Sequence, residues 1–396
     1  MDNQEKIMKK LSEFFVLLEV SLRNREPFVT TLSQSQATYI RLIPRKSRSL
    51  EGKRHVKTAP VRLIRAQEDY HKSHPDTVFC VVSIRRLECL ASLLGDDSAF
   101  ISQDDKARVP IGLTAANKQA PFMMHMDFVV GPGHKLIPSV YAGCRVNETK
   151  PIGQPDGVSY SGPTYIAINS GKHSSSTAAT HAQDFERLLT LDNFKSILKT
   201  PSGVVKPVLI FTFDGGPDEN PRYQKVIAYA VRHFLDHNLD YIAIACNAPG
   251  RSAFNRVERR MAPLSHQLAG IIIPHDKFGS HLDTQRRTTD VDLEKKNFKC
   301  AGETLASVWN EMVIDGESVV AEYICPDKPD PEIGSHPGPE WYTKHVMESQ
   351  YMLQISKCSD LACCTMSRSK LRKILPDGFM PPPLLLTSNL EAAPFS

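Results

Sequence analysis

Short apolar runs of strand length recur through the middle of the chain. The clearest covers residues 208–213, where β-branched and aromatic side chains stop at Asp214 and two glycines follow. This pattern is typical of a buried strand that ends in a sharp turn. Similar runs predict further strands at 100–104, 107–112, 123–130, 164–169 and 241–246. The tight link through residues 105 and 106 predicts that the first two of these form a hairpin.

Apolar residues at helical spacing separate and flank these strands. The periodicity predicts helices over residues 5–22, 66–95, 178 onward, 221–237 and 253–271. Asn220 is the expected cap of the fourth helix, and Pro221 falls in its first turn, where a missing N–H costs nothing. A β-meander followed by alternating helices and strands is the order of a ribonuclease H-like fold.

The element order predicts an α/β protein with a ribonuclease H-like mixed sheet flanked by helices. We expect a helical N-terminal region over 1–95, a catalytic core over 96–290 and an irregular C-terminal region over 291–396. Residues 131–162 are rich in Gly and Pro and are interpreted as an insertion in the core. Nine basic residues between 41 and 65 face a single acid, Glu51, so this stretch is either a phosphate-binding or nuclear-import segment or a solvated linker.

Charge and cysteine content narrow the cellular setting. The net charge of +4 is too small to indicate nucleic acid by itself. No apolar run approaches the roughly 20 residues of a membrane-spanning helix, so we expect no membrane partner. Glu13 and Glu19 interrupt the first apolar stretch, which argues against a signal peptide. The nine cysteines are an odd number, which favours reduced thiols in an intracellular compartment.

Three acidic residues take positions that suit metal-dependent chemistry. Asp104 ends the first predicted strand, Asp214 ends the strand at 208–213, and Glu258 is expected about two turns into the helix at 253–271. Neighbouring strands would place the two aspartates side by side. Clustered carboxylates repel unless a cation holds them, and oxygen ligands suit Mg²⁺ or Mn²⁺. Two such ions about 4 Å apart would support phosphoryl displacement by water or by a DNA 3′-hydroxyl.

Each of these acids also has a simpler interpretation. Asp105 competes with Asp104, and strand alternation allows only one of them to face the site. Asp214 could merely form an Asx-turn. Glu258 could pair with one of the arginines near it in the sequence. These arginines could themselves either bind DNA phosphates or lie on a solvated helix face; they are Arg251, Arg256, Arg259 and Arg260.

Several segments resemble transposase-derived proteins that occur in many copies in animal genomes. SQDDKA resembles the stretch at the first catalytic aspartate of mariner-like transposases, DGGPDENP the region of the second, and APGRSAFNRVERRMAPLS the helix of the third acid. The similarity extends from about residue 54 to the C-terminus. It implies a DDE-type catalytic core with Asp104, Asp214 and Glu258 as the acidic triad, and it favours Asp104 over Asp105.

Cysteine and histidine side chains gather near the C-terminus. The pattern W-x3-H-x12-C-x4-CC begins at Trp341 and contains His345, Cys358, Cys363 and Cys364. These side chains could hold a structural Zn²⁺, or the cysteines could simply be free thiols. Cys325 is a further candidate ligand. His233 and His237 are spaced i, i+4 on one predicted helix. The glutamate of a zincin motif is missing there, so a structural role is expected.

The sequence therefore predicts a transposase-like DNA-binding protein that cleaves or joins phosphodiester bonds with two Mg²⁺ or Mn²⁺ ions. DNA is the expected partner, a homo-oligomer the expected assembly, and the nucleus (or cytoplasm) the expected location. A catalytically silent, transposon-derived DNA-binding or interaction protein is the main alternative. A ribonuclease H-fold nuclease without strand transfer is a third possibility.

Overall fold

The computed structural model describes residues 74–112, 130–146, 152–216, 220–251, 254–268, 271–334 and 337–383. All of them belong to one compact unit, His71–Ser396. Among these residues, no helix combines the length and the apolar character needed to cross a membrane. The predicted helix over 5–22 and the basic stretch over 41–65 lie outside the described residues, as does the predicted strand over 123–130 apart from Val130.

A single mixed sheet forms the centre of the unit. Its strands are β1 (Ser98–Asp105), β2 (Val109–Pro110), β3 (Lys135–Cys144), β4 (Thr164–Ser170), β5 (Val208–Phe213), β6 (Tyr241–Cys246), β7 (Val313–Ile314), β8 (Glu317–Tyr323), β9 (Val346–Glu348) and β10 (Met352–Ser356). Their order is β7-β8-β4-β3-β1-β5-β6-β10-β9, and β2 pairs with β3. β1 is antiparallel to β3 and parallel to β5, and β5 is parallel to β6.

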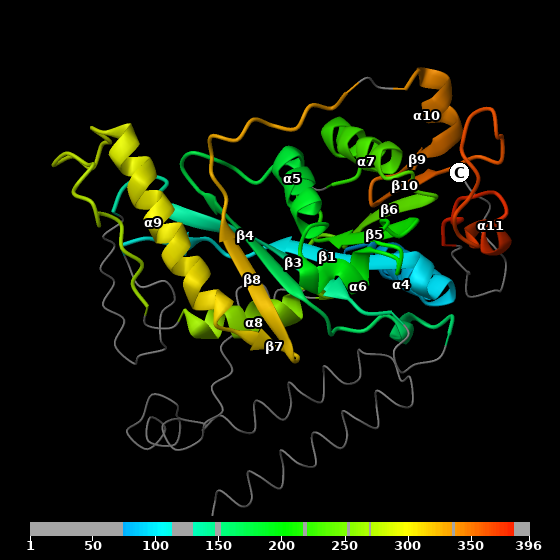
Figure 1. The fold of residues 1–396 in the computed structure, drawn as a ribbon, viewed down its shortest axis with the longest axis horizontal. Coiled ribbons are helices and arrows are strands. Elements are labelled where there is room, and N and C mark those ends of the chain that lie inside the picture. The colour runs from blue at the N-terminus through cyan, green and yellow to red at the C-terminus, as the bar shows by residue number, and fades with distance from the viewer. Residues whose placement is uncertain are drawn as a thin grey trace, which may run out of the picture. The chain divides into compact units, whose positions relative to one another are not determined.

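Helices cover both faces of the sheet (Figure 1). The helices are α4 (Thr77–Leu94), α5 (Ala178–Leu188), α6 (Lys195–Leu198), α7 (Gln224–Asp236), α8 (Glu258–Gln267), α9 (Val291–Asn310), α10 (Pro339–His345) and α11 (Leu371–Ile374). α5, α6 and α7 pack on one face, where they meet residues such as Ile101 and Leu209. α4, α8, α9 and α11 cover the other face, where Phe100 and Val140 lie.

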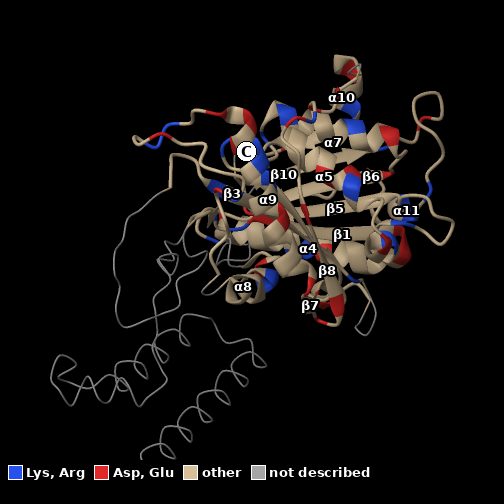
Figure 2. Cartoon of the chain, turned by 60° about the vertical axis from the view of Figure 1, so that its left-hand side comes forward, with Lys and Arg blue, Asp and Glu red and all other residues tan. Residues whose placement is uncertain are grey.

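The central strands are apolar because both of their faces are buried. β5 and β6 contain no charged residue, and all of their side chains are buried. Continuous apolar strands are typical of parallel strands covered by helices on both sides. Figure 2 shows the corresponding distribution, with charges on the helices and loops around an almost uncharged sheet centre.

The predicted mixed α/β class is confirmed, but the composition of the antiparallel part is different from the prediction. Strands predicted at 100–104, 164–169, 208–213 and 241–246 are present as β1, β4, β5 and β6. The partner of β1 is β3, which lies inside the supposed insertion over 131–162. The predicted hairpin between 100–104 and 107–112 is wrong, because only Val109–Pro110 of the second segment is extended, and this short strand pairs with β3 instead of β1.

A proline explains why β3 does not look like a strand in the sequence. Pro138 cannot donate a ladder hydrogen bond and is usually confined to strand edges. In the structure Pro138 lies one residue past the end of the β1 pairing, which stops where Asp105 is opposite Ser139. The carbonyl of Pro138 accepts a hydrogen bond from the backbone of Lys106, 2.8 Å away. β3 can therefore contain a proline, although a proline in a sequence normally argues against a strand at that position.

One predicted helix start differs from the structure, and another is confirmed. α7 begins at Gln224, and Asn220 caps a preceding turn instead, since its side chain accepts from the Arg222 backbone at 3.1 Å. α5 begins at Ala178 as predicted, with a capping box between Thr177 and Thr180. Thr177 thereby satisfies one of the first N–H groups of the helix.

The expectation of an irregular region after residue 290 is wrong. This part of the chain contains α9, two strands that close one flank of the sheet and two that close the other. β8 runs parallel to β4, and β10 runs antiparallel to β6. The C-terminal quarter is therefore built into the same sheet as the residues that precede it.

Candidate functional site

Asp104 and Asp214 lie at the same end of two neighbouring parallel strands. In the pairing of β1 with β5, Ser102 is opposite Thr212. Asp104 lies two residues after Ser102, and Asp214 lies two residues after Thr212. The Asp104 side chain is buried. The Asp214 carboxylate accepts a hydrogen bond from the backbone N–H of Gly216 at 3.0 Å, across a turn in which Gly215 has a φ of 94°. That positive φ is accessible to glycine at little cost, so the chain turns sharply as soon as β5 ends.

Strand alternation separates Asp104 from Asp105. The Ser102 hydroxyl bonds to Asn255, on the face that α8 covers, whereas the Gln103 amide contacts His181 of α5 on the opposite face. Asp105 falls on the Gln103 side and accepts a hydrogen bond from Ser139 at 2.6 Å. Successive side chains of a strand point to opposite faces. Asp104 therefore shares its face of the sheet with Asn255, just ahead of α8, and Asp105 does not.

Glu258 is the first residue of α8, so the expected position about two turns inside a helix is wrong. The turn before it is fixed to the sheet by Asn255. The amide Oδ1 of this residue accepts hydrogen bonds from Ser102 at 2.5 Å and from Thr212 at 3.2 Å. Its Nδ2 donates to the carbonyl of Gln103 at 2.9 Å. One buried side chain thus joins β1, β5 and the start of α8 immediately beside the ends of both strands.

Lys106 provides a second link between the end of β1 and α8. Its buried ammonium group donates to the hydroxyl of Ser265 and to the carbonyl of Met261, the latter at 3.4 Å. Burial lowers the pKa of Lys106, and the nearby Glu258 carboxylate acts in the opposite direction. Sequence reasoning did not assign a role to either Asn255 or Lys106.

Replacing Asn255 with Ala should lower the free energy of unfolding by about 2–3 kcal/mol. The change leaves the Ser102 and Thr212 hydroxyls and the Gln103 carbonyl without this partner in a dry environment, and buried unsatisfied groups cost about 1–3 kcal/mol. Urea denaturation monitored by circular dichroism measures the effect. Asn193→Ala is the control, since its amide makes one exposed contact of 3.4 Å. Equal stability of the two variants would contradict the role of Asn255.

Two of the arginines considered as phosphate ligands are buried in ion pairs. Arg256 binds Glu88 of α4 at 2.8 Å. Arg260 is fully buried and donates to Asp315 at 2.7 Å and to the carbonyls of Tyr160 and Gly162. These guanidinium groups hold α8 to the surrounding chain. They are therefore not positioned to contact a phosphate, which corrects that interpretation for Arg256 and Arg260.

A groove of about 1070 Å³ lies next to the end of β1. Arg108 and Lys225 are among its lining residues, together with Thr177 at the N-terminus of α5 and Tyr223 at the N-terminus of α7. Helix N-termini carry a partial positive charge. The two helix N-termini and the basic side chains favour an anion in this groove, whereas the carboxylate of Asp105, which also lines it, opposes one. No local sequence pattern indicates this groove, because its walls come from four separate segments, 105–108, Ile137, 175–178 and 223–226.

The four residues of the C-terminal Cys/His pattern lie together. One ligand atom from each of His345, Cys358, Cys363 and Cys364 falls within 4.8 Å of the others, and Cys325 is not in this group. The Nε2 atom of His345 is 3.3 Å from the sulfur of Cys363 and 3.9 Å from that of Cys364. Tetrahedral Zn²⁺ with ordinary bond lengths would separate such nitrogen and sulfur atoms by about 3.5 Å.

The surroundings act differently on these side chains, because burial and the neighbouring Cys358 and Cys363 raise the pKa of Cys364 to about 11. The Nδ1 atom of His345 is 2.7 Å from the carbonyl of Ser356 and donates to it, which leaves the lone pair on Nε2. Burial raises the pKa of the Cys358 thiol, but hydrogen bonds from the Asp360 backbone and from Cys364, Cys363 and Lys344 outweigh burial and lower it. All nine cysteines lie in described residues, and none forms a disulfide.

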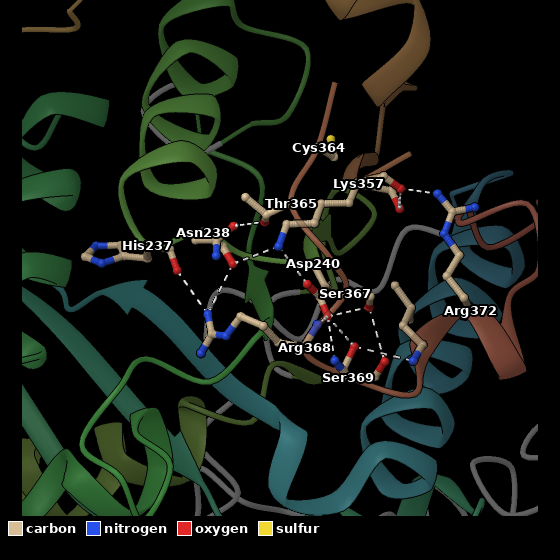
Figure 3. A network of polar contacts seen from close by, with 12 residues as sticks. His237, Asn238, Asp240, Lys357, Cys364, Thr365, Ser367, Arg368, Ser369 and Arg372 are labelled. Atoms are coloured by element: carbon tan, nitrogen blue, oxygen red, sulfur yellow. Dashed lines mark hydrogen bonds and ion pairs between the residues drawn. The ribbon is translucent and has the colours of Figure 1, made fainter. Parts of the chain in front are cut away.

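A buried carboxylate anchors the loop that carries these cysteines (Figure 3). Asp240, just before β6, accepts a hydrogen bond from the ammonium group of Lys357 at 3.0 Å. Its other oxygen accepts from the Ser367 hydroxyl and from the backbone and hydroxyl of Ser369, all at 2.7–2.8 Å, and from the Arg368 backbone at 2.7 Å. Asp240 is 1 % exposed and Lys357 is 6 % exposed. Residues 357–369 are therefore fixed to the core at both ends of the cysteine cluster.

Asp240→Ala should destabilise the protein by about 3–5 kcal/mol. Removal of one partner from a buried ion pair leaves the other charge, here Lys357, without compensation. Guanidinium denaturation gives the value, and Asp236→Ala serves as the control, because the Asp236 carboxylate is half exposed and pairs with Arg232 four residues earlier. A loss under 1 kcal/mol for Asp240→Ala would mean that this network does not hold the loop.

Comparison with known proteins adds no identification. No protein-family model, no curated protein and no solved structure matches the chain.

Proposed function

We propose that the chain is a DDE-type transposase-like protein that binds DNA and cleaves or joins phosphodiester bonds. The observation that carries the proposal is the attachment of the α8 start to β1 and β5 through Asn255, beside the strand ends that carry Asp104 and Asp214. Carboxylates gathered at one edge of a mixed sheet are typical of metal-dependent phosphoryl transfer.

The strand order supports a ribonuclease H-like core. Within the sheet, the path β4-β3-β1-β5-β6 corresponds to three antiparallel strands followed by two strands parallel to the first. The predicted order for that fold is a β-meander followed by alternating helices and strands, and here β1, β3 and β4 form the meander in place of the segments at 107–112 and 123–130. Because a fold hosts many activities, the acids and not the topology carry the functional part of the proposal.

Asp104, Asp214 and Glu258 would hold two Mg²⁺ or Mn²⁺ ions. The donor set is entirely oxygen, which fits these hard cations. When bound, such ions stabilise the attacking and leaving oxygens of an in-line displacement. Asn255 would keep the β1 and β5 ends at a fixed distance from Glu258, and Lys106 would limit the negative charge beside it.

The groove beside β1 would receive the DNA backbone. Arg108 and Lys225 would neutralise phosphates, and the N-terminal N–H groups of α5 and α7 could donate to phosphate oxygens. Such contacts position a strand without reading its sequence. The proposal implies a nuclear location, and assembly into a homo-oligomer is the expectation that the resemblance brings.

A strand-cleavage assay with Mn²⁺ tests this function. We expect nicking of DNA by the full chain, and joined product when a pre-cleaved end with a free 3′-hydroxyl is supplied. Cleavage without joining would favour a nuclease of the same fold. DNA binding without any cleavage would favour the catalytically silent alternative, for which the Gly216 hydrogen bond gives Asp214 a purely structural explanation.

We further propose that His345, Cys358, Cys363 and Cys364 hold a structural Zn²⁺. The support is the convergence of four ligand atoms at near-tetrahedral spacing and the fixed tautomer of His345. The ion would tie α10 to the loop after β10.

A further inference from the structure

A second group of metal-ligating side chains lies on the opposite side of the sheet from α8. Glu186 of α5 faces His233 and His237 of α7. One carboxylate oxygen of Glu186 is 3.1 Å from Nδ1 of His233 and 3.0 Å from Nε2 of His237. The Glu186 side chain is 44 % exposed, whereas those of the two histidines are 8 % and 17 % exposed. The cluster is thus partly shielded yet open to solvent on one side.

The spacing of these atoms is close to that of a metal centre. With bonds of 2.0–2.1 Å and tetrahedral angles, two ligands of Zn²⁺ lie about 3.3 Å apart. The two observed nitrogen–oxygen distances need to lengthen by only a few tenths of an ångström. The ring of Phe185 packs against both imidazoles, with centroids 4.8 and 5.9 Å away, so their orientation is fixed before any ion arrives.

The charges around the cluster permit a cation. Glu186 supplies the carboxylate of the cluster, and two guanidinium groups that line the adjoining pocket are already paired, Arg187 with Glu322 and Arg232 with Asp236. Lys328 also lines this pocket.

A third group, His134, His281 and Glu294, makes an informative contrast. It is also compact and more deeply buried, but the Lys172 ammonium lies 2.9 Å from both oxygens of Glu294. The two imidazoles bond to each other at 2.8 Å, and Asn297 contacts the free nitrogen of His281. That group is satisfied as a hydrogen-bond network with its own cation. Among the described residues, Glu186 is bonded to the two imidazoles, and no lysine ammonium group pairs with its carboxylate.

A pocket of about 420 Å³ gives access to the cluster. Glu186 and His233 line it together with Arg187, Arg232 and a stretch of chain after β8 that includes Pro329 and Pro331. Three protein ligands with an adjoining cavity leave a coordination position for water or for another small ligand. An entry path of this kind is one of the features required of a metal site.

We propose that Glu186, His233 and His237 bind one first-row divalent cation of the zinc class, with an open position toward this pocket. Each imidazole must offer the ion a lone pair on the nitrogen that now faces Glu186. On binding, the proton on Nδ1 of His233 therefore moves to Nε2 of the same ring, and the proton on Nε2 of His237 moves to Nδ1 of its ring. Glu186 is already ionised. The ion joins α5 to α7 across the apolar layer that covers the sheet, and this site is independent of the proposed DNA chemistry.

Zinc titration of the full-length protein tests the proposal. We expect the wild type to bind one more Zn²⁺ per chain than Glu186→Gln or His237→Ala, as counted by native mass spectrometry and calorimetry. Zinc should raise the melting temperature of the wild type and of two controls, His266→Ala and Glu303→Gln, which alter an exposed histidine and an exposed glutamate on other helices. It should raise the melting temperature of the two site variants less.

The Cys363→Ser, Cys364→Ser double variant separates this ion from that of the cysteine cluster. It should keep the ion at Glu186, and its Co²⁺ complex should lack the sulfur-to-metal absorption that thiolate ligands produce. Circular dichroism of the metal-free site variants establishes that they are folded. Equal zinc counts for the wild type and folded Glu186→Gln, or loss of all zinc from the cysteine variant, would overturn the assignment.

Discussion

The Asp214→Asn variant is expected to lose Mn²⁺-dependent DNA cleavage by more than about 100-fold. Even outer-shell partners of metal ligands cost 10–100-fold when they are replaced, and a direct ligand should cost more. Asn keeps the size of the side chain and can still accept the hydrogen bond from Gly216, so the turn after β5 should survive. The variant therefore removes charge with little change of shape. Rates of plasmid nicking at saturating DNA measure the loss.

The adjacent aspartates of β1 provide a matched comparison. Asp104→Asn should lose activity to a similar extent, because this residue lies on the α8 face of the sheet. Asp105→Asn should keep most of it, since Asp105 lies on the other face and its partner Ser139 can donate equally well to an amide oxygen. Calorimetry with Mn²⁺ gives a second readout. Activity that depends on Asp105 and not on Asp104 would contradict the proposed triad.

Loss of zinc from the C-terminal cluster is expected to destabilise the protein by more than about 4 kcal/mol. Removal of a structural metal is among the few single changes that reach this size. Binding free energies of structural Zn²⁺ are large because the site forms only in the folded chain. Cys363→Ser should therefore lower the thermal midpoint strongly, and prolonged dialysis against a chelator should do the same to the wild type.

Cys325→Ser is the matched control for this prediction. Its thiol is exposed and lies outside the cluster, so its replacement should leave the melting temperature unchanged. The zinc content of the purified protein should fall by one ion per chain in Cys363→Ser only. Purified wild type without zinc, together with equal melting temperatures for the two variants, would show that the cluster is a group of free thiols.

Much of the parallel half of the sheet could be predicted because its signal is local. β5 and β6 are runs without charged residues that end at Asp214 and Asn247, and each is buried on both faces. The antiparallel half of the sheet is harder to predict from the sequence. β3 carries a proline and is flanked by glycines, and only its position past the end of β1 makes that proline acceptable. β8 alternates buried and half-buried residues because α9 covers one face only, which is a weak pattern in seven residues.

The candidate acids could be proposed from strand ends, but the residues that hold them in place could not. Asn255 is one asparagine in a loop, and nothing local distinguishes it from a solvent-exposed turn residue. Its role follows from contacts with residues more than forty positions away in the chain. The Cys/His pattern was visible because its spacing is compact, whereas Glu186 lies 47 positions from His233 and could be paired with it only in the folded structure.

The order in which the sheet is completed has a consequence for synthesis of the chain. β4 and β6, which would otherwise be the outermost long strands, are covered by β8 and β10, and both covering strands come from beyond residue 316. A ribosome that has made only the first 300 residues has therefore released a sheet with two open edges. Unpaired strand edges invite association with other chains. The growing polypeptide is thus more prone to aggregate in the interval before β8 and β10 emerge.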